Sequence, residues 1–209
     1  MRPVLIDKCR PRKNINEMID KIKQLRQETS VSLSQCKKAL EETGGDLDKS
    51  KEILRKWGEK LAGKRGGRET SQGIVEAYIH ANKKLGVLVE VKCETDFVAK
   101  NEDFKEFAHN LALHIAATNP LYLSEDEIPE ALIEKEKEIY KEQMVEEKKK
   151  PELMDKIIEG KVAKFKKEIA LLSQTYIKDD NQIIEGLLNE TIAKIGENIT
   201  IARFSRLEI

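Results

Sequence analysis

The feature that most constrains the fold is a change of hydrophobic period between residues 85 and 115. Strands place side chains alternately on two faces, whereas helices repeat every 3.6 residues. Residues 85–94 alternate: one face carries Leu85, Val87, Val89, Val91 and Cys93. From Asn101 the helical period takes over, with Phe104, Phe107, Ala108, Leu111 and Ile115 on one face. This pattern predicts a half-buried strand that leads into an amphipathic helix ending before Asn119-Pro120.

The elements around this pair predict an α+β fold. Residues 73–94 read as a hairpin with its loop at residues 82–84. Residues 124–172 are dense in Glu and Lys and broken by Pro151, which predicts a long antiparallel pair of helices that leans on the sheet. A last helix is expected to stop at Gly196, and residues 199–207 alternate as a closing strand. Three strands outside a βαβ order predict a three-stranded antiparallel sheet packed with helices.

A separate small unit is predicted over residues 16–58. Three short apolar-periodic segments follow one another there, and Gly44-Gly45 divides the last two. Ser32, with Gln35 three residues later, is a capping box for the second helix, and Asp46 is an N-cap for the third. We interpret the unit as a three-helix bundle of the ubiquitin-associated type. A core this small is typical of a binding module rather than of an enzyme.

The remaining segments complete the predicted organisation. Residues 1–15 hold an excess of basic side chains and are expected to form a disordered arm rather than a trimmed transit peptide. Residues 59–73 are rich in Gly and basic residues. No Gly-Lys there is followed by Ser or Thr, so a flexible linker is favoured over a phosphate loop. The core domain then spans residues 74–209 and includes the helical pair at 124–172.

Composition limits the classes of partner. Lys plus Arg and Asp plus Glu are both 38, so the net charge gives no basic excess for direct nucleic-acid binding. No apolar run approaches the roughly 20 residues that a membrane-spanning helix needs. The three cysteines, Cys9, Cys36 and Cys93, are scattered and odd in number, which favours a reducing compartment. We therefore expect a cytoplasmic protein.

A search for catalytic chemistry finds little. His109 and His114 are five residues apart and do not share a helical face as a zinc pair would. His80 and Cys93 would have to be cross-strand neighbours for a thiol- or metal-dependent enzyme, which is one alternative hypothesis. The many carboxylates lie in Lys-rich helical runs typical of solvated faces. We predict no catalytic residues, no metal site and no cofactor.

The junction between the strand and the helix leaves two interpretations open. It carries the acid Asp96 beside the aromatic Phe97. In the first, Thr95 or Asp96 caps a helical turn and Phe97 folds back onto the hairpin. In the second, Asp96 and Phe97 are presented to a partner, because an aromatic ring on a rigid corner is a typical interface anchor.

The heptapeptide Thr95-Asp96-Phe97-Val98-Ala99-Lys100-Asn101 resembles the signature of the elongation factor Ts family, the guanine-nucleotide exchange factors of bacterial and organellar translation. The likeness extends from about residue 16 to residue 207. It includes the stretches Cys36-Lys37-Lys38-Ala39-Leu40, Gly86-Val87-Leu88-Val89-Glu90-Val91, Gln174-Thr175-Tyr176-Ile177-Lys178-Asp179-Asp180 and Gly196-Glu197-Asn198-Ile199. The chain is similar to the short members, which have one core subdomain.

This resemblance implies a function without catalytic chemistry of its own. The partner would be elongation factor Tu, with GDP release promoted by disturbance of its Mg²⁺ and phosphate site. The residues matching that role are Thr95, Asp96, Phe97 and Val98, with further contacts at Arg26, Leu33, Ser34, Ala99 and Lys100. The resemblance leaves open whether such a short member acts as a monomer or as a homodimer. The alternative is a ubiquitin-associated-like adaptor whose binding does not depend on nucleotide state.

Overall fold

The computed structural model describes residues 12–29, 31–146 and 151–209. Contacts divide the chain into two compact units, with the boundary between Lys64 and Arg65. Each unit is considered by itself. Most of the predicted basic arm, residues 1–11, lies outside the described residues. No helix within the described ranges is both long enough and apolar enough to cross a membrane.

The first unit is a three-helix bundle. It comprises α1 (Arg12–Thr29), α2 (Leu33–Glu42) and α3 (Leu47–Arg65). Its core is small and aliphatic, and the side chain of Trp57 packs against it. The buried members are Leu25, Cys36, Ala39, Leu40 and Leu54. Both predicted N-caps are confirmed: the Ser32 hydroxyl accepts from the backbone N–H of Gln35, and an Asp46 carboxylate oxygen accepts from that of Lys49.

Two of the predicted boundaries differ from the structure. Helix α1 begins at Arg12, so residues 12–15 of the predicted arm are helical. The first three residues of this helix, Arg12, Lys13 and Asn14, are polar, so apolar periodicity gives no signal at its start. Helix α3 continues past Gly58 and takes up residues 59–65 of the predicted linker. The reason is a buried stripe at four-residue spacing that does not stop at residue 58: Ser50, Leu54, Gly58 and Ala62.

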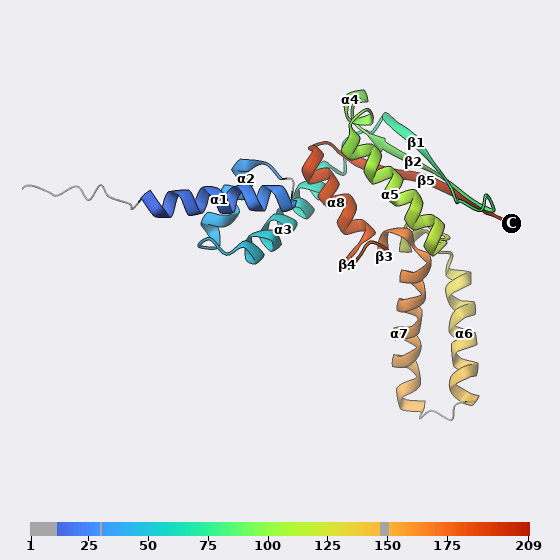
Figure 1. The fold of residues 1–209 in the computed structure, drawn as a ribbon. Coiled ribbons are helices and arrows are strands. Elements are labelled where there is room, and N and C mark those ends of the chain that lie inside the picture. Colours follow the sequence, from blue (N-terminus) through green and yellow to red (C-terminus); the bar gives the residue numbers. More distant parts are fainter. Residues whose placement is uncertain (1–11, 30, 147–150) are drawn as a thin grey trace, which may run out of the picture. The chain divides into compact units, whose positions relative to one another are not determined.

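The second unit has an antiparallel sheet in the order β1-β2-β5 (Figure 1). Strand β1 (Gln72–Ile79) and strand β2 (Leu85–Cys93) form the predicted hairpin, and β5 (Ile199–Glu208) pairs with the other edge of β2. Helix α5 (Glu102–Thr118) covers one face. Val87, Val89 and Val91 are buried on that face. The predicted α+β class and the change of period are confirmed.

A second sheet was not predicted. Strands β3 (Thr175–Tyr176) and β4 (Asp179–Ile183) form a two-stranded ladder just before α8 (Ile184–Ile195). The sequence of β4 is Asp-Asp-Asn-Gln-Ile, which has no apolar alternation and therefore gives no strand signal. Helix α8 ends at Gly196, which has a left-handed φ of 91°, as the predicted glycine stop requires.

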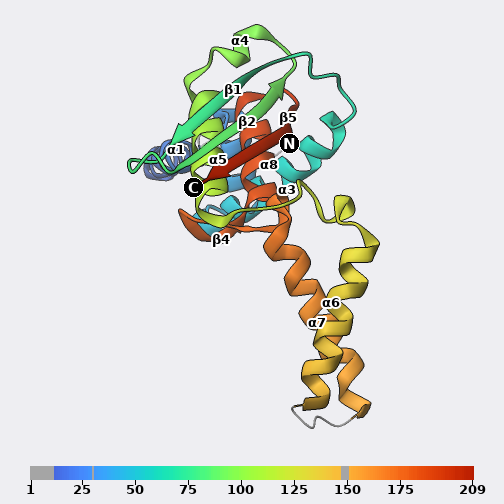
Figure 2. The ribbon, with the colours of Figure 1, turned by 90° about the vertical axis from the view of Figure 1, so that its right-hand side faces the viewer.

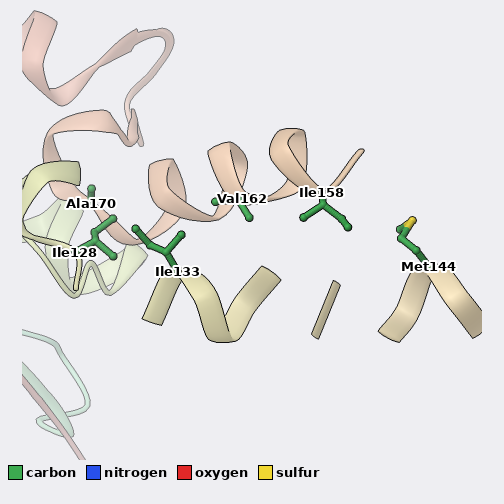
Figure 3. Close-up of a cluster of buried hydrophobic side chains, with 6 residues drawn as sticks. All are labelled: Ile128, Ile133, Met144, Ile158, Val162 and Ala170. Atoms are coloured by element: carbon green, nitrogen blue, oxygen red, sulfur yellow. The ribbon is translucent and has the colours of Figure 1, made fainter. Parts of the chain in front are cut away.

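The predicted helical pair is confirmed as α6 (Glu130–Glu146) and α7 (Pro151–Ile169). The expectation that the pair leans on the sheet is wrong: Figure 2 shows the two helices side by side, extending away from the sheet of the second unit. A cluster of buried side chains lies between them (Figure 3): Ile128, Ile133, Met144, Ile158, Val162 and Ala170. At the base, a bridge between Tyr122 and Ala170 connects the pair to the chain that leaves α5.

Candidate protein-binding site

The corner between β2 and α5 contains a single helical turn, α4 (Asp96–Ala99). Thr95 is its N-cap, with extended backbone (φ −125°, ψ 157°). The Thr95 hydroxyl accepts a hydrogen bond from the backbone N–H of Val98 at 3.4 Å, which satisfies a donor that the helix leaves free. Of the two caps that the sequence allowed, Thr95 is the one used. We refer to residues 95–100 as the corner.

The ring of Phe97 points to solvent. The residue is 81% exposed, whereas its neighbour Val98 is only 9% exposed. Successive residues of a helix are about 100° apart around the axis, so a single turn that buries Val98 against the unit turns Phe97 away from it. The interpretation that Phe97 folds back onto the hairpin is therefore wrong. Within the part of the chain that the structure describes, most of the ring surface is left uncovered.

The acid beside the ring forms an ion pair within the corner. The Lys100 ammonium lies 2.8 Å from an Asp96 carboxylate oxygen, four residues along the chain. This hydrogen bond and the positive charge of Lys100 lower the pKa of Asp96. Both side chains are largely exposed. The Asp96 carboxylate is thus ionised at neutral pH, and it is exposed enough to leave Lys100 and bind another group.

The start of the corner is tied to the turn that follows α8. Glu197 accepts hydrogen bonds from both the backbone N–H of Thr95 (3.0 Å) and its hydroxyl (2.7 Å). In return, Glu94 accepts from the backbone N–H of Asn198 at 2.6 Å. That hydrogen bond is the main cause that lowers the pKa of Glu94. Each segment therefore supplies one carboxylate to the backbone of the other.

Beneath the corner, the Cys93 thiol donates to the backbone carbonyl of Thr95 at 3.1 Å. Cys93 is fully buried, and this burial raises the pKa of its thiol. A thiol with a raised pKa is a poor nucleophile at neutral pH. The role of Cys93 is therefore to support the corner rather than to react.

The other predicted contacts lie in the first unit. Arg26 is in the last turn of α1, while Leu33 and Ser34 begin α2. All three are exposed, and Leu33 is an apolar side chain with 47% of its surface in solvent. They come from the same end of the bundle, because α1 ends where α2 begins. The structure thus brings these three together on one module and the corner residues together on the other.

Comparison with known proteins identifies the family. The family model for elongation factor Ts matches residues 12–191. An elongation factor Ts of Thermotoga petrophila is 52% identical over 192 residues, or 91% of this chain and 95% of that protein. Those of Coprothermobacter proteolyticus and Nitratidesulfovibrio vulgaris are 53% and 50% identical, over 88% and 90% of this chain and 94% of each protein. The chain belongs to the elongation factor Ts family.

The enzyme alternative does not fit this structure. Cys93 pairs with Gln72 at one end of the hairpin, while the backbone N–H of His80 bonds to Leu85 at the other end. The two side chains cannot form a dyad. Within the described residues, no three His, Cys, Asp or Glu side chains converge as metal ligands would. His109 bonds to Glu76 on the surface, and His114 is buried against Gln174.

Sequence reasoning did not assign a role to Glu197 or Glu94. The stretch 196–199 counts toward the family resemblance, but no pattern in a single sequence links Glu197 to Thr95, 102 positions earlier. The one usable local signal is Gly196, a helix-stopping glycine that makes the next residue the first of a fixed turn. Only the fold reveals which backbone that residue reaches.

Proposed function

We propose that this chain accelerates GDP release from elongation factor Tu by inserting the Phe97 ring of the corner into that partner. As a member of the elongation factor Ts family, it is a nucleotide exchange factor for elongation factor Tu in translation elongation. We further propose that it acts in the cytoplasm, without catalytic chemistry of its own. The observation that carries the mechanism is the exposure of Phe97, 81%, on a corner whose backbone is held in place.

The physical argument starts from how a GTPase holds GDP. Backbone amides surround the phosphates and a Mg²⁺ ion neutralises their charge. A protein that binds the nucleotide-free state more tightly than the loaded state must weaken GDP binding by the same factor. A large ring inserted near the metal site does this by displacing the elements that bind Mg²⁺. The apolar ring gains its burial energy only when those elements have moved.

Asp96 adds an electrostatic contribution. In the free chain its charge is balanced by Lys100 at 2.8 Å. Close to a Mg²⁺ and phosphate site, the carboxylate competes with the phosphates for the cation and for backbone N–H donors. Lys100 can then rotate away at little cost, because an exposed ion pair of this kind contributes at most about 1 kcal/mol.

The bundle supplies affinity in this proposal. Arg26, Leu33 and Ser34 bind the partner's nucleotide domain, and the sheet unit holds a more distant domain. We interpret the bundle as ubiquitin-associated-like, a type suited to binding through one exposed end. Leu33 is the apolar anchor and Arg26 the polar contact at that end.

The decisive experiment measures release of a fluorescent GDP from purified elongation factor Tu, with and without the chain. The wild-type chain should accelerate release, and an Asp96→Ala/Phe97→Ala variant should lose most of that acceleration. Val145→Ala is a matched control, since Val145 is also exposed and apolar but belongs to α6. Equal affinity of the chain for nucleotide-free and GDP-bound elongation factor Tu would instead favour the adaptor alternative.

We also propose that the chain pairs with itself through the outer face of the sheet. That face carries four exposed apolar residues that the strand register places close together: Val75, Ile79, Leu88 and Leu207. Figure 2 shows α5 and α8 on the opposite side of the sheet. The face also carries charges of both signs, since Glu90 forms ion pairs with Arg203 and Lys92, so a two-fold copy can bring opposite charges together.

Sedimentation equilibrium tests this assembly. The wild-type chain should sediment as a dimer at micromolar concentration, and Leu88→Lys should sediment as a monomer. Val145→Lys, which places the same charge on an exposed site outside the sheet, should leave the dimer intact. A wild-type chain that remains monomeric would refute the proposal.

A further inference from the structure

We propose that Glu197 is a positioning residue of the exchange reaction, which holds the corner so that Phe97 meets the partner in one orientation. This inference rests on the proposed function of Phe97. It assigns a role in exchange to a residue 100 positions away from the ring in sequence and on a different element. Glu197 itself need not touch elongation factor Tu.

The geometry makes Glu197 a two-point clamp. One carboxylate oxygen accepts from the Thr95 hydroxyl at 2.7 Å and the other from the Thr95 backbone N–H at 3.0 Å. Hydrogen bonds to a charged acceptor are roughly twice as strong as neutral ones. Because the hydroxyl has only one proton and gives it to Glu197, its lone pairs face the Val98 N–H that it caps. The carboxylate therefore fixes both the backbone and the side-chain rotamer of the N-cap.

The corner needs such a clamp because it has little else to fix it. Helix α4 has four residues, and a single isolated turn is not stable in water. The ring of Phe97 contributes almost no packing, since most of it is exposed. Besides its own backbone hydrogen bonds and the exposed Asp96–Lys100 pair, the turn is held by the buried side chain of Val98, the thiol of Cys93 and the Glu197 clamp at its start.

Gly196 puts Glu197 in place. Its left-handed backbone ends α8, and its N–H bonds to the carbonyl of Ile192. The reversal makes Glu197 the first residue of the following turn, and the adjacent Asn198 is held by Glu94 from the other side. The Glu197 carboxylate binds the Thr95 backbone and the Glu94 carboxylate binds the Asn198 backbone, so the turn after α8 has little freedom to move. The clamp is therefore rigid at both ends.

A Phe97 ring that is already held in one orientation should accelerate GDP release more than a mobile one. The conformational entropy lost on ordering it is then lost before the partner binds. Without Glu197, the turn is free to sample other conformations, and only a fraction of encounters presents the ring correctly. Loss of a hydrogen-bonded charged acceptor is expected to lower the maximal rate of GDP release by about tenfold or more. The half-saturating concentration should change little, since the bundle supplies most of the affinity in the proposed function.

The test compares Glu197→Ala and Glu197→Gln with wild type in two assays. Amide hydrogen exchange of the free chain should become faster at Thr95 and Val98 in Glu197→Ala. GDP release from elongation factor Tu should show a lower maximal rate, with Glu197→Gln between the two because it keeps one acceptor oxygen. Glu125→Ala is the matched control: Glu125 also accepts from a hydroxyl at 2.7 Å, that of Ser173, but away from the corner.

A double variant separates positioning from general damage. If Glu197 acts through the ring, Glu197→Ala should cause no further loss of rate in a Phe97→Ala background. Additive losses, or wild-type release by Glu197→Ala, would overturn the inference, as would unchanged hydrogen exchange at the corner. A wild-type chain that fails to accelerate release would refute the proposed function itself and this inference with it.

Discussion

Replacing Phe97 with alanine should separate exchange activity from stability. The residue is 81% exposed, so only about a fifth of its surface is buried in the free chain. Complete burial of a Phe side chain contributes about 1.5–3 kcal/mol, so truncation should lower the free energy of unfolding by at most about 0.6 kcal/mol. The exposed four fifths can contribute about 2 kcal/mol when a partner buries them, which corresponds to a fall in exchange rate of about 30-fold.

The assays are denaturant unfolding of the free chain and stimulated release of fluorescent GDP from elongation factor Tu. Phe104→Ala is the reciprocal control, because Phe104 of α5 is fully buried inside the sheet unit. Its truncation should lower the free energy of unfolding by about 3–5 kcal/mol. A Phe97→Ala chain that loses as much stability as Phe104→Ala would show that the ring packs internally. Undiminished GDP release would show that the ring is not the element that acts on the partner.

Three further predictions concern other parts of the molecule. Lys100→Ala should raise the pKa of Asp96 toward its ordinary value, because the Lys100 hydrogen bond is the main cause that lowers it; a carboxyl titration by NMR checks this. A lowered carboxyl pKa stabilises the fold above the ordinary value and this stability is lost as pH falls through the lowered pKa, so the variant should lose less stability on acidification. Leu40→Ala, at a fully buried position, should cost about 2–5 kcal/mol and unfold the bundle. Trp57, the single tryptophan, packs against that core and reports its unfolding by fluorescence, and an unchanged midpoint would contradict the small core. Burial lowers the pKa of His114, so the unfolded chain binds its proton first and stability should fall as the pH drops below the ordinary histidine value. His114→Phe should flatten that dependence in denaturant titrations between about pH 7 and pH 5.5.

The parts of the fold that follow from local pattern were accessible from sequence. Strand β2 and helix α5 each have one buried face. The spacing of their apolar side chains therefore shows a period of two residues in the strand and 3.6 in the helix. The caps Ser32 and Asp46 were accessible because each bonds to a backbone N–H three residues later. At the corner the sequence allowed either Thr95 or Asp96, and the structure uses Thr95. These are interactions within a few residues of chain.

The sequence could not show which side of a short or polar element faces the interior, nor which distant residues meet in the fold. Phe97 and Val98 are adjacent and both apolar, and only the packing of the single turn against the sheet decides that Val98 is buried. Strand β4 carries polar residues on both faces, so its ladder depends on pairing with β3 rather than on hydrophobic pattern. The bond from Thr95 to Glu197 spans 102 positions and follows from topology alone.

The exposed area of the Phe97 ring sets an upper limit on how much of the weakening of GDP binding the ring alone can explain. About 2 kcal/mol of burial changes an equilibrium by about 30-fold, and by linkage this bounds how far the ring alone can weaken GDP binding. Contacts that are equal in the loaded and the nucleotide-free partner, such as those proposed for Arg26 and Leu33, add affinity but no difference between the two states. The remainder must therefore come from groups that gain contacts only when GDP leaves. Asp96 is the acidic residue next to Phe97 in the chain, and its exposed pair with Lys100 leaves it able to form such a contact. In the proposed function, the corner therefore supplies the difference in affinity between the two states of the partner, and the bundle supplies affinity common to both.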